Sequence, residues 1–334
     1  MRRFESSHPN LSVTMMQTKN NEPLLFSGTS NPALAKEMAQ VLGLELSDVA
    51  IECFPDGEIS LQIKESVRGR DVFVVQPIAL RPNYFLMELL VMVDALRRAS
   101  AKSIVAVVPY FGYCRQDRID KARAPITAKL VANMLVNAGV TRVLTMDLHS
   151  KQVQGFFDIP VDNLRALSVL APKVRALGLK EMVVVAPDAG SIKLARSFAN
   201  ALGVDFAIVD KDRIDASHVA TTTVIGDIAG KDVLLADDMC STAGTLLSAA
   251  KACRERGANR VIAAVSHGLF VGPAVERVED SPIEQVIYCN SIPSDERLAG
   301  ATKLSPVSVA GLFGKAIQCI LSAESISSLM EGDC

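Results

Sequence analysis

The chain has 334 residues, of which 49% are hydrophobic and 22% are charged, and this length and composition suit two globular domains better than one. A formal net charge of −2 gives no bulk electrostatic basis for binding nucleic acid, and no apolar run approaches the roughly 18 residues that a membrane span needs. The seven cysteines are scattered and form no Cys-x-x-Cys pair, so we expect a reducing compartment, the cytoplasm, and neither a disulfide framework nor a structural zinc site.

Residues 1–23 are polar and include two arginines but no apolar signal-peptide core, so we predict a mobile N-terminal tail. An organellar transit peptide is the weaker alternative, because Glu5 and Glu22 are unusual in such a segment.

From Leu24 onward, short apolar runs alternate with stretches of helical periodicity, a pattern typical of parallel sheets covered by helices. The helical stretches include 32–42, 86–99, 126–138 and 192–202. The predicted strands are 24–26, 72–75, 104–108, 143–146, 182–186, 206–209, 233–236, 261–265 and 286–288. Residues 59–63 alternate between apolar and polar side chains, which predicts a half-exposed strand in a hairpin or at a sheet edge.

Residues 231–257 combine a strand, a turn and a helix. Asp237 and Asp238 directly follow the apolar run, and a turn of small residues leads into a helical stripe that ends near Gly257. A helix N-terminus offers unpaired N–H groups and the positive end of the helix dipole, which bind phosphate. Because carboxylates suit the hydroxyls of a sugar, directly or through a divalent metal, we predict a sugar-phosphate site. An ordinary strand–turn–helix with an exposed acidic pair is the alternative.

Polar residues also follow the strands at 143–146, 182–186 and 206–209, where α/β sheets place their ligands. The segments 143–150 and 233–241 both consist of a predicted strand followed by an acidic residue and a turn, and this similarity hints at two related domains.

Several segments together resemble the ribose-phosphate pyrophosphokinase family. The stretch VLLADDMCSTAGT (233–245) resembles the phosphoribosyl-binding loop of the type I phosphoribosyltransferase fold, which this family shares. Segments that resemble the pyrophosphokinases in particular include FPDGE (54–58), VVPYFGYCRQDR (107–118), TMDLHSKQVQGFFDIPVDNL (145–164), APDAG (186–190) and VDKDR (209–213). The resemblance runs in register over residues 24–329.

The resemblance implies an α/β fold of two phosphoribosyltransferase-type (type I) domains, each a mainly parallel sheet flanked by helices. We expect an N-terminal domain over 24–165, a C-terminal domain over 166–309, and a final helix at about 310–329 that packs back on the first. The implied reaction moves the pyrophosphoryl group of MgATP to the anomeric hydroxyl of ribose 5-phosphate. It yields 5-phosphoribosyl 1-diphosphate and AMP for nucleotide biosynthesis.

The resemblance also implies roles for residues that bind ATP and metal. Arg115 and Gln116 match an ATP-binding segment, and His149 and Asp188 match the Mg²⁺ site. A hairpin in this family reaches the adenine of a neighbouring subunit's ATP, which implies a homo-oligomer, a hexamer built from dimers. The matching residues here are Phe54, Asp56 and Glu58.

On the sugar side, Lys211 and Arg213 match the two catalytic cations of a mobile loop, and Asp237 and Asp238 match the carboxylates that hold the ribose hydroxyls. The residues expected to wrap the 5-phosphate are Ser241, Thr242, Ala243, Gly244 and Thr245.

Some positions depart from the family pattern, namely Tyr84, Ser191, Leu194, Asp212 and Ser241. Ser241 stands where an acid is usual, and Lys193 compensates in part for the arginine that Leu194 replaces. These changes leave open a weakly active or inactive associated subunit of the same family. A phosphoribosyltransferase is disfavoured by residues 54–58 and 115–118. A redox-sensitive, acidified thiol at Cys240, near the helix start, is a further hypothesis, but a small residue that simply fits the turn is favoured.

Overall fold

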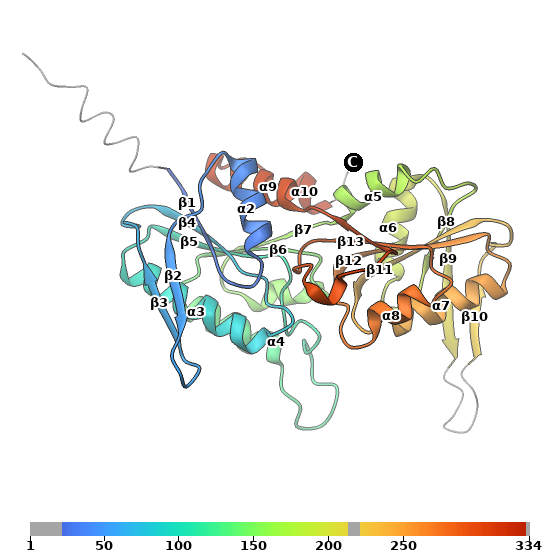
Figure 1. Cartoon of the computed structure of the whole chain (residues 1–334), viewed down its shortest axis with the longest axis horizontal. Coiled ribbons are helices and arrows are strands. Elements are labelled where there is room, and N and C mark those ends of the chain that lie inside the picture. Colours follow the sequence, from blue (N-terminus) through green and yellow to red (C-terminus); the bar gives the residue numbers. More distant parts are fainter. Residues whose placement is uncertain (1–21, 213–220, 332–334) are drawn as a thin grey trace, which may run out of the picture.

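The computed structural model describes residues 22–212 and 221–331, so nearly all of the predicted tail lies outside the described residues. Two large sheets lie next to each other (Figure 1). The sheet of the N-terminal half is parallel, with the strand order β1-β4-β5-β6-β7. Its strands are β1 (Leu24–Ser27), β4 (Asp71–Val75), β5 (Ser103–Val108), β6 (Arg142–Met146) and β7 (Val161–Leu164).

The sheet of the C-terminal half has seven strands in the order β10-β9-β8-β11-β12-β13-β14. All neighbours are parallel except β9 and β10, which form an antiparallel hairpin. The strands are β8 (Val183–Ala186), β9 (Asp205–Asp212), β10 (Thr221–Ile225), β11 (Asp232–Cys240), β12 (Arg260–Gly268), β13 (Gln285–Cys289) and β14 (Leu304–Val307).

The predicted strands are confirmed, because each apolar run lies in a strand with helices over both faces of its sheet. The alternating segment 59–63 is also confirmed as β3 (Ile59–Ile63), which pairs antiparallel with β2 (Val49–Cys53). The predicted C-terminal end of one strand was wrong. The strand β11 does not end at Ala236 but continues through both aspartates, because its register with β12 persists to the pair Cys240 and Gly268.

Helices cover both faces of the sheets (Figure 1). In this view α2 (Pro32–Leu42), α5 (Leu167–Arg175), α6 (Ile192–Leu202), α9 (Ala310–Ser322) and α10 (Ser327–Glu331) lie above the sheets. Below them lie α3 (Pro82–Arg98), α4 (Thr127–Ala138), α7 (Gly244–Glu255) and α8 (Ala274–Glu279). Two short 3₁₀ turns are η1 (Lys151–Phe156) and η2 (Glu296–Leu298). None of the helices in the described residues is both long and apolar enough to cross a membrane.

One apolar core runs continuously across both halves. It joins side chains of the first sheet, such as Phe73 and Leu144, to side chains of the second, such as Leu234 and Ile287. The opposite faces of the two sheets instead pack into two separate cores. The halves are therefore fixed to each other by burial along one face.

The helix α9 belongs to this shared core and packs against α2. A methyl group on Gly314 would lie 2.6 Å from Val41 Cγ1, so only glycine allows this close approach. Asn31 also donates a hydrogen bond of 3.0 Å to the carbonyl of Asn290, in the other half. The domain limits at 165 and 309 stay a prediction.

Candidate active site

A cavity of about 1000 Å³ opens where the carboxyl ends of β6, β8 and β11 meet. Parallel sheets place ligands at this edge, because loops there diverge and helix N-termini point inward. The lining brings together most of the predicted site residues, namely Arg115, His149, Asp188, Asp237, Asp238 and the whole segment 241–245.

The segment 241–245 joins the end of β11 to the first turn of α7. Ala243 adopts the left-handed conformation, with φ 64°, which turns the chain sharply into the helix at Gly244. No side chain caps this helix, so its first N–H groups stay available at the cavity. Backbone bonds hold the turn in place, since Val271 N donates to the Ser241 carbonyl at 2.9 Å. The geometry suits a phosphate bound by backbone amides.

The two aspartates of β11 differ in charge state. Burial, together with the negative charges of Asp238 and Asp188, raises the pKa of Asp237 to about 8. Burial also acts to raise the pKa of Asp238, but the hydrogen bond from His149 and the positive charge of that ring outweigh it and hold this pKa below its usual value. Asp237 is therefore the protonated partner at neutral pH, and Asp238 is the anion.

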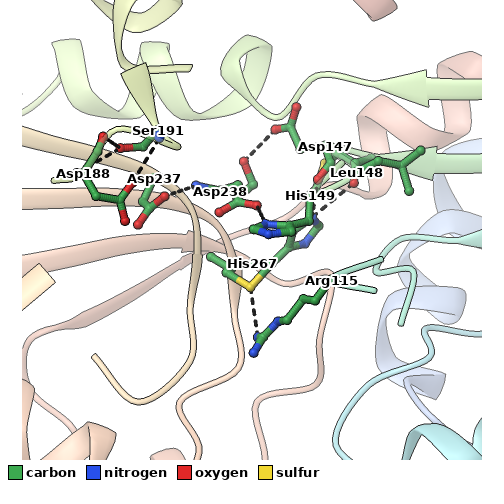
Figure 2. Close-up of polar contacts among 12 residues, drawn as sticks. Arg115, Asp147, Leu148, His149, Asp188, Ser191, Asp237, Asp238 and His267 are labelled. Atoms are coloured by element: carbon green, nitrogen blue, oxygen red, sulfur yellow. Dashed lines mark hydrogen bonds and ion pairs between the residues drawn. The ribbon is translucent and has the colours of Figure 1, made fainter. Parts of the chain in front are cut away.

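His149 faces Asp238, with 2.6 Å between its Nδ1 and the carboxylate Oδ2 (Figure 2). This hydrogen bond raises the pKa of His149, although burial opposes the shift. The contact crosses from the first sheet to the second and fixes the orientation of both side chains.

Metal binding at this edge depends on oxygen ligands. Asp188, Asp237 and Asp238 all line the cavity, but within the described residues no group of three His, Cys, Asp or Glu side chains lies close enough to hold an ion alone. Mg²⁺ commonly takes one or two carboxylates and completes its shell with water and substrate phosphates. The donor set therefore fits Mg²⁺ brought with a phosphate-bearing substrate.

The loop after β5 supplies Arg115 from the opposite wall. Its Nη2 lies 2.9 Å from the sulfur of Met239, as Figure 2 shows. Gln116, in contrast, does not line the cavity, because its backbone carbonyl and its side chain are bonded to Ala128 and Thr127 at the start of α4.

The predicted adenine hairpin lies away from the cavity of its own chain. Phe54 is 53% exposed at the tip between β2 and β3, and neither it nor Asp56 or Glu58 lines the cavity. The tip is ordered by a hydrogen bond of 2.8 Å from Phe54 N to the Glu58 carbonyl. Tyr84 supports its base, because Tyr84 Oη lies 3.2 Å from Cys53 Sγ.

Of the two predicted catalytic cations, the described residues include only the backbone of Lys211. The backbone of Lys211 is in β9, opposite Thr222, while its side chain and all of Arg213 lie outside the described residues. The neighbouring Asp210 lines the cavity, so the hairpin begins at its edge.

A buried junction lies behind His149 and was not predicted from the sequence. Asp147, with φ 37°, accepts hydrogen bonds from Ser266 Oγ at 2.6 Å and Ala166 N at 3.1 Å. Beside it, His267 lies 3.1 Å from the Met146 carbonyl and 2.8 Å from Ser291 Oγ, and burial lowers its pKa. His267 is thus a neutral structural histidine that ties β12 to the end of β6.

One of the departures from the family pattern, Ser191, has a structural explanation. Ser191 closes the turn after β8, because its N–H and hydroxyl bond to Asp188 at 3.1 Å and 2.9 Å. For Cys240, burial raises the thiol pKa to about 12. The hypothesis of an acidified, redox-sensitive thiol is therefore wrong.

Comparisons with known proteins agree over most of the chain. The family described as the N-terminal domain of ribose phosphate pyrophosphokinase matches residues 24–139, and the phosphoribosyl synthetase-associated domain matches residues 213–331. The chain is 47% identical to a ribose-phosphate pyrophosphokinase of Helicobacter pylori (strain J99), over 94% of this chain and 98% of the relative. It is 49% identical to that of Aquifex aeolicus, over 91% and 98%.

A solved structure is similar as well. The crystal structure of phosphoribosylpyrophosphate synthetase from Mycobacterium smegmatis has a TM-score of 0.85 and 38% sequence identity, covering 90% of this chain and 99% of that one.

Proposed function

The chain belongs to the ribose-phosphate pyrophosphokinase family, and we propose that it transfers the pyrophosphoryl group of MgATP to ribose 5-phosphate, giving 5-phosphoribosyl 1-diphosphate and AMP. One observation carries this proposal. A single cavity holds the uncapped start of α7, the carboxylates of β11 and Asp188, and Arg115. It can therefore accept a sugar phosphate and a nucleotide together.

The sugar would bind along the end of β11 and the start of α7. The N–H groups of 241–245 bind the 5-phosphate, with the helix dipole favouring its charge. The ribose hydroxyls meet Asp237 and Asp238. A protonated Asp237 can both donate and accept a hydrogen bond, whereas the anionic Asp238 accepts only, so the pair suits two neighbouring hydroxyls.

The nucleotide would bind from the other wall, with Arg115 contacting it and His149 and Asp188 holding Mg²⁺. Gln116 does not line the cavity, so its predicted contact with the nucleotide would require its side chain to leave Thr127. When bound, the metal neutralises the phosphate charge and orients the chain of phosphates. The anomeric hydroxyl oxygen forms a bond to the β-phosphorus and releases its proton to solvent, the bond from that phosphorus to the α,β-bridging oxygen breaks, and AMP leaves with that oxygen. Lys211 and Arg213 stabilise the charge of the migrating group.

Phe54, Asp56 and Glu58 would serve the active site of a neighbouring subunit. The supporting observation is that this exposed tip does not line its own cavity. Complementation tests the idea: mixing Phe54→Ala subunits with Lys211→Ala subunits in equal amounts should restore about a quarter of the wild-type activity, because one site in four receives both intact parts. Activity that stays at the level of the separate variants would exclude a shared site.

The resemblance to the family implies a homo-oligomer, a hexamer built from dimers, and light scattering on the purified chain measures its size. A reducing compartment such as the cytoplasm fits the six free cysteines of the described residues.

The direct test is the reaction itself. Purified protein with MgATP and ribose 5-phosphate should release AMP in a 1:1 ratio to the sugar consumed, measured by anion-exchange chromatography. A folded, assembled protein that releases no AMP would contradict the proposal and identify the inactive associated subunit instead.

A further inference from the structure

His267 lies buried where the two halves of the molecule meet, behind His149 (Figure 2). It belongs to β12 in the second half, and its Nε2 lies 3.1 Å from the Met146 carbonyl and 3.3 Å from the Asp147 carbonyl, at the end of β6 in the first half. Because a carbonyl only accepts hydrogen bonds, Nε2 of this neutral ring carries the proton, and Nδ1 accepts a bond from the Ser291 hydroxyl at 2.8 Å. Both nitrogens are therefore engaged, and the ring has one orientation.

An irregularity in β12 brings two consecutive side chains to the end of β6. The pairing of β12 with β13 shifts by one residue between Val265 and His267, so Ser266 is an extra residue of β12. Consecutive side chains of a regular strand point to opposite faces of the sheet. Here Ser266 Oγ lies 2.6 Å from Asp147 Oδ2, and His267 reaches the carbonyl of Met146. Bulges commonly redirect side chains in this way next to functional sites.

The segment that His267 holds has a backbone conformation that needs support. Asp147 has φ 37°, which is uncommon for residues other than glycine and persists only where the surroundings fix it. Its carboxylate is held as well, since Arg165 Nε lies 3.2 Å from Oδ1. Two residues later, His149 Nδ1 lies 2.6 Å from Asp238 Oδ2. A shift of the backbone at Asp147 would therefore move His149.

The His267 ring also contacts Tyr110, and Tyr110 contacts Arg115. The two rings pack edge to face, with their centroids 5.0 Å apart. Burial raises the pKa of Tyr110, and the charge of Arg115 and a hydrogen bond between these two side chains oppose the shift. The space that the three residues line together is nearly full, with a cavity of about 10 Å³. In such close packing, a shift of one side chain displaces its neighbours.

We propose that His267 is a positioning residue for the nucleotide side of the active site: it holds the backbone that carries His149 and packs on the tyrosine that contacts Arg115. The inference rests on the proposed function, in which His149 and Arg115 serve MgATP. His267 does not line the large cavity, so it acts through these neighbours. Because it lies in the second half, it couples the nucleotide residues of the first half to the sheet that carries the sugar site.

Two substitutions at His267 separate its hydrogen bond from its bulk. His267→Phe keeps a ring against Tyr110 but removes the donor to the Met146 carbonyl, whereas His267→Gln keeps an N–H donor. We expect His267→Phe to bind MgATP about tenfold more weakly, measured by isothermal titration calorimetry without ribose 5-phosphate, and to release AMP about tenfold more slowly. Its affinity for ribose 5-phosphate should stay within about twofold of the wild type, and His267→Gln should recover most of both losses.

A loss of stability alone should not give this pattern. Ile283→Ala is the matched control, because Ile283 is fully buried and precedes β13, at the edge of the second sheet opposite the cavity. We expect this variant to have a lower melting temperature, as His267→Phe does, but to bind both substrates and release AMP as the wild type does while it is folded.

Equal MgATP affinity in the Phe and Gln variants would overturn the inference, and so would an equal loss of affinity for both substrates. If His267→Phe does not fold, Tyr110→Phe decides, because it keeps the ring contact and loses the hydroxyl beside Arg115. About threefold weaker MgATP binding by Tyr110→Phe supports the inference, and unchanged binding overturns it. A wild-type protein that binds MgATP but releases no AMP would refute the proposed function, and weaker MgATP binding by His267→Phe would then still support the positioning role.

Discussion

The ends of β6 and β11 meet at one cavity but present different groups to it, side chains after β6 and backbone amides after β11. Each strand is followed by a residue with positive φ and then by a helical turn. After β6 this residue is the acid Asp147, and after β11, which contains two acids, it is Ala243. After β11 the turn enters an α-helix of 12 residues with uncapped amides, so the backbone faces the ligand. After β6 it enters a short 3₁₀ turn, and side chains such as His149 and Lys151 face the cavity instead.

The difference teaches how one pattern of strand, acid and turn can yield two kinds of site. A backbone site depends on the shape of the turn and tolerates changes of side chain. A side-chain site depends on residue identity. Substitutions at the two strand ends can therefore test whether one site depends on the backbone and the other on side chains.

Lys211→Ala should cause the largest loss of turnover, because it removes a positively charged side chain that stabilises the migrating group in the proposed mechanism. We expect turnover to fall about a hundredfold or more while ribose 5-phosphate affinity changes little. Steady-state AMP release and calorimetry measure the two quantities. Lys36→Ala, on the exposed side of α2, is the control, and near-normal turnover in Lys211→Ala would refute its catalytic assignment.

Ala243→Val should damage the backbone site without removing any polar group. A β-branched residue strongly disfavours φ near 64°, so the turn into α7 is expected to shift and ribose 5-phosphate to bind about tenfold more weakly. Ala243→Gly, which adopts this conformation freely, should bind within about twofold of the wild type. Equal binding by the Val and Gly variants would mean that the turn geometry is unimportant.

Asp237→Asn should stabilise the ligand-free, metal-free protein in a pH-dependent way. The pKa of Asp237 is raised to about 8 in the folded state, so ionisation opposes folding. The free energy of unfolding of the wild type therefore falls as pH rises from about 4 to about 8, and this contribution does not change further above pH 8. We expect the variant's melting temperature to exceed that of the wild type by about 2 °C or more at pH 9, and by much less at pH 5.

Thermal melts at several pH values measure this difference. The exposed Asp158→Asn is the matched control, since it changes the formal charge equally without a buried carboxyl. A pH-independent difference for Asp237→Asn would show that its ionisation is not suppressed by folding.

Ser241→Ala should have the smallest effect. If phosphate is held by N–H groups, loss of this hydroxyl should change ribose 5-phosphate affinity by less than about threefold. A loss as large as that of Ala243→Val would show that side chains dominate the β11 site as well, and the contrast between the two strand ends would disappear.

Nine of the twelve strands in the two sheets were predictable because each contains an unbroken apolar run; β7, β10 and β14 were not predicted. The extent of β11 was missed, since Asp237 and Asp238 interrupt the apolar run, although β11 pairs with β12 at Asp237 and again at Met239 and Cys240. The strand β7 was missed for a related reason: Asp162 and Asn163 lie in its middle.

The sugar-phosphate loop could be predicted because its chemistry is contiguous in the sequence. The junction around Asp147 could not, because its members come from distant segments with no local pattern. Only the position of Arg165, directly after β7, was a usable signal, and it depended on recognising that strand.

The packing of α9 on α2 has a consequence for synthesis on the ribosome. Leu34 and Met38 of α2 are fully buried in a core that also contains Phe313 and Ile317 of α9. While the chain is being translated, the first half has every one of its own strands but lacks the helix that covers α2. We therefore expect apolar side chains on its upper face to stay uncovered until α9 has been synthesised, so the first half cannot complete its core before the second half is made.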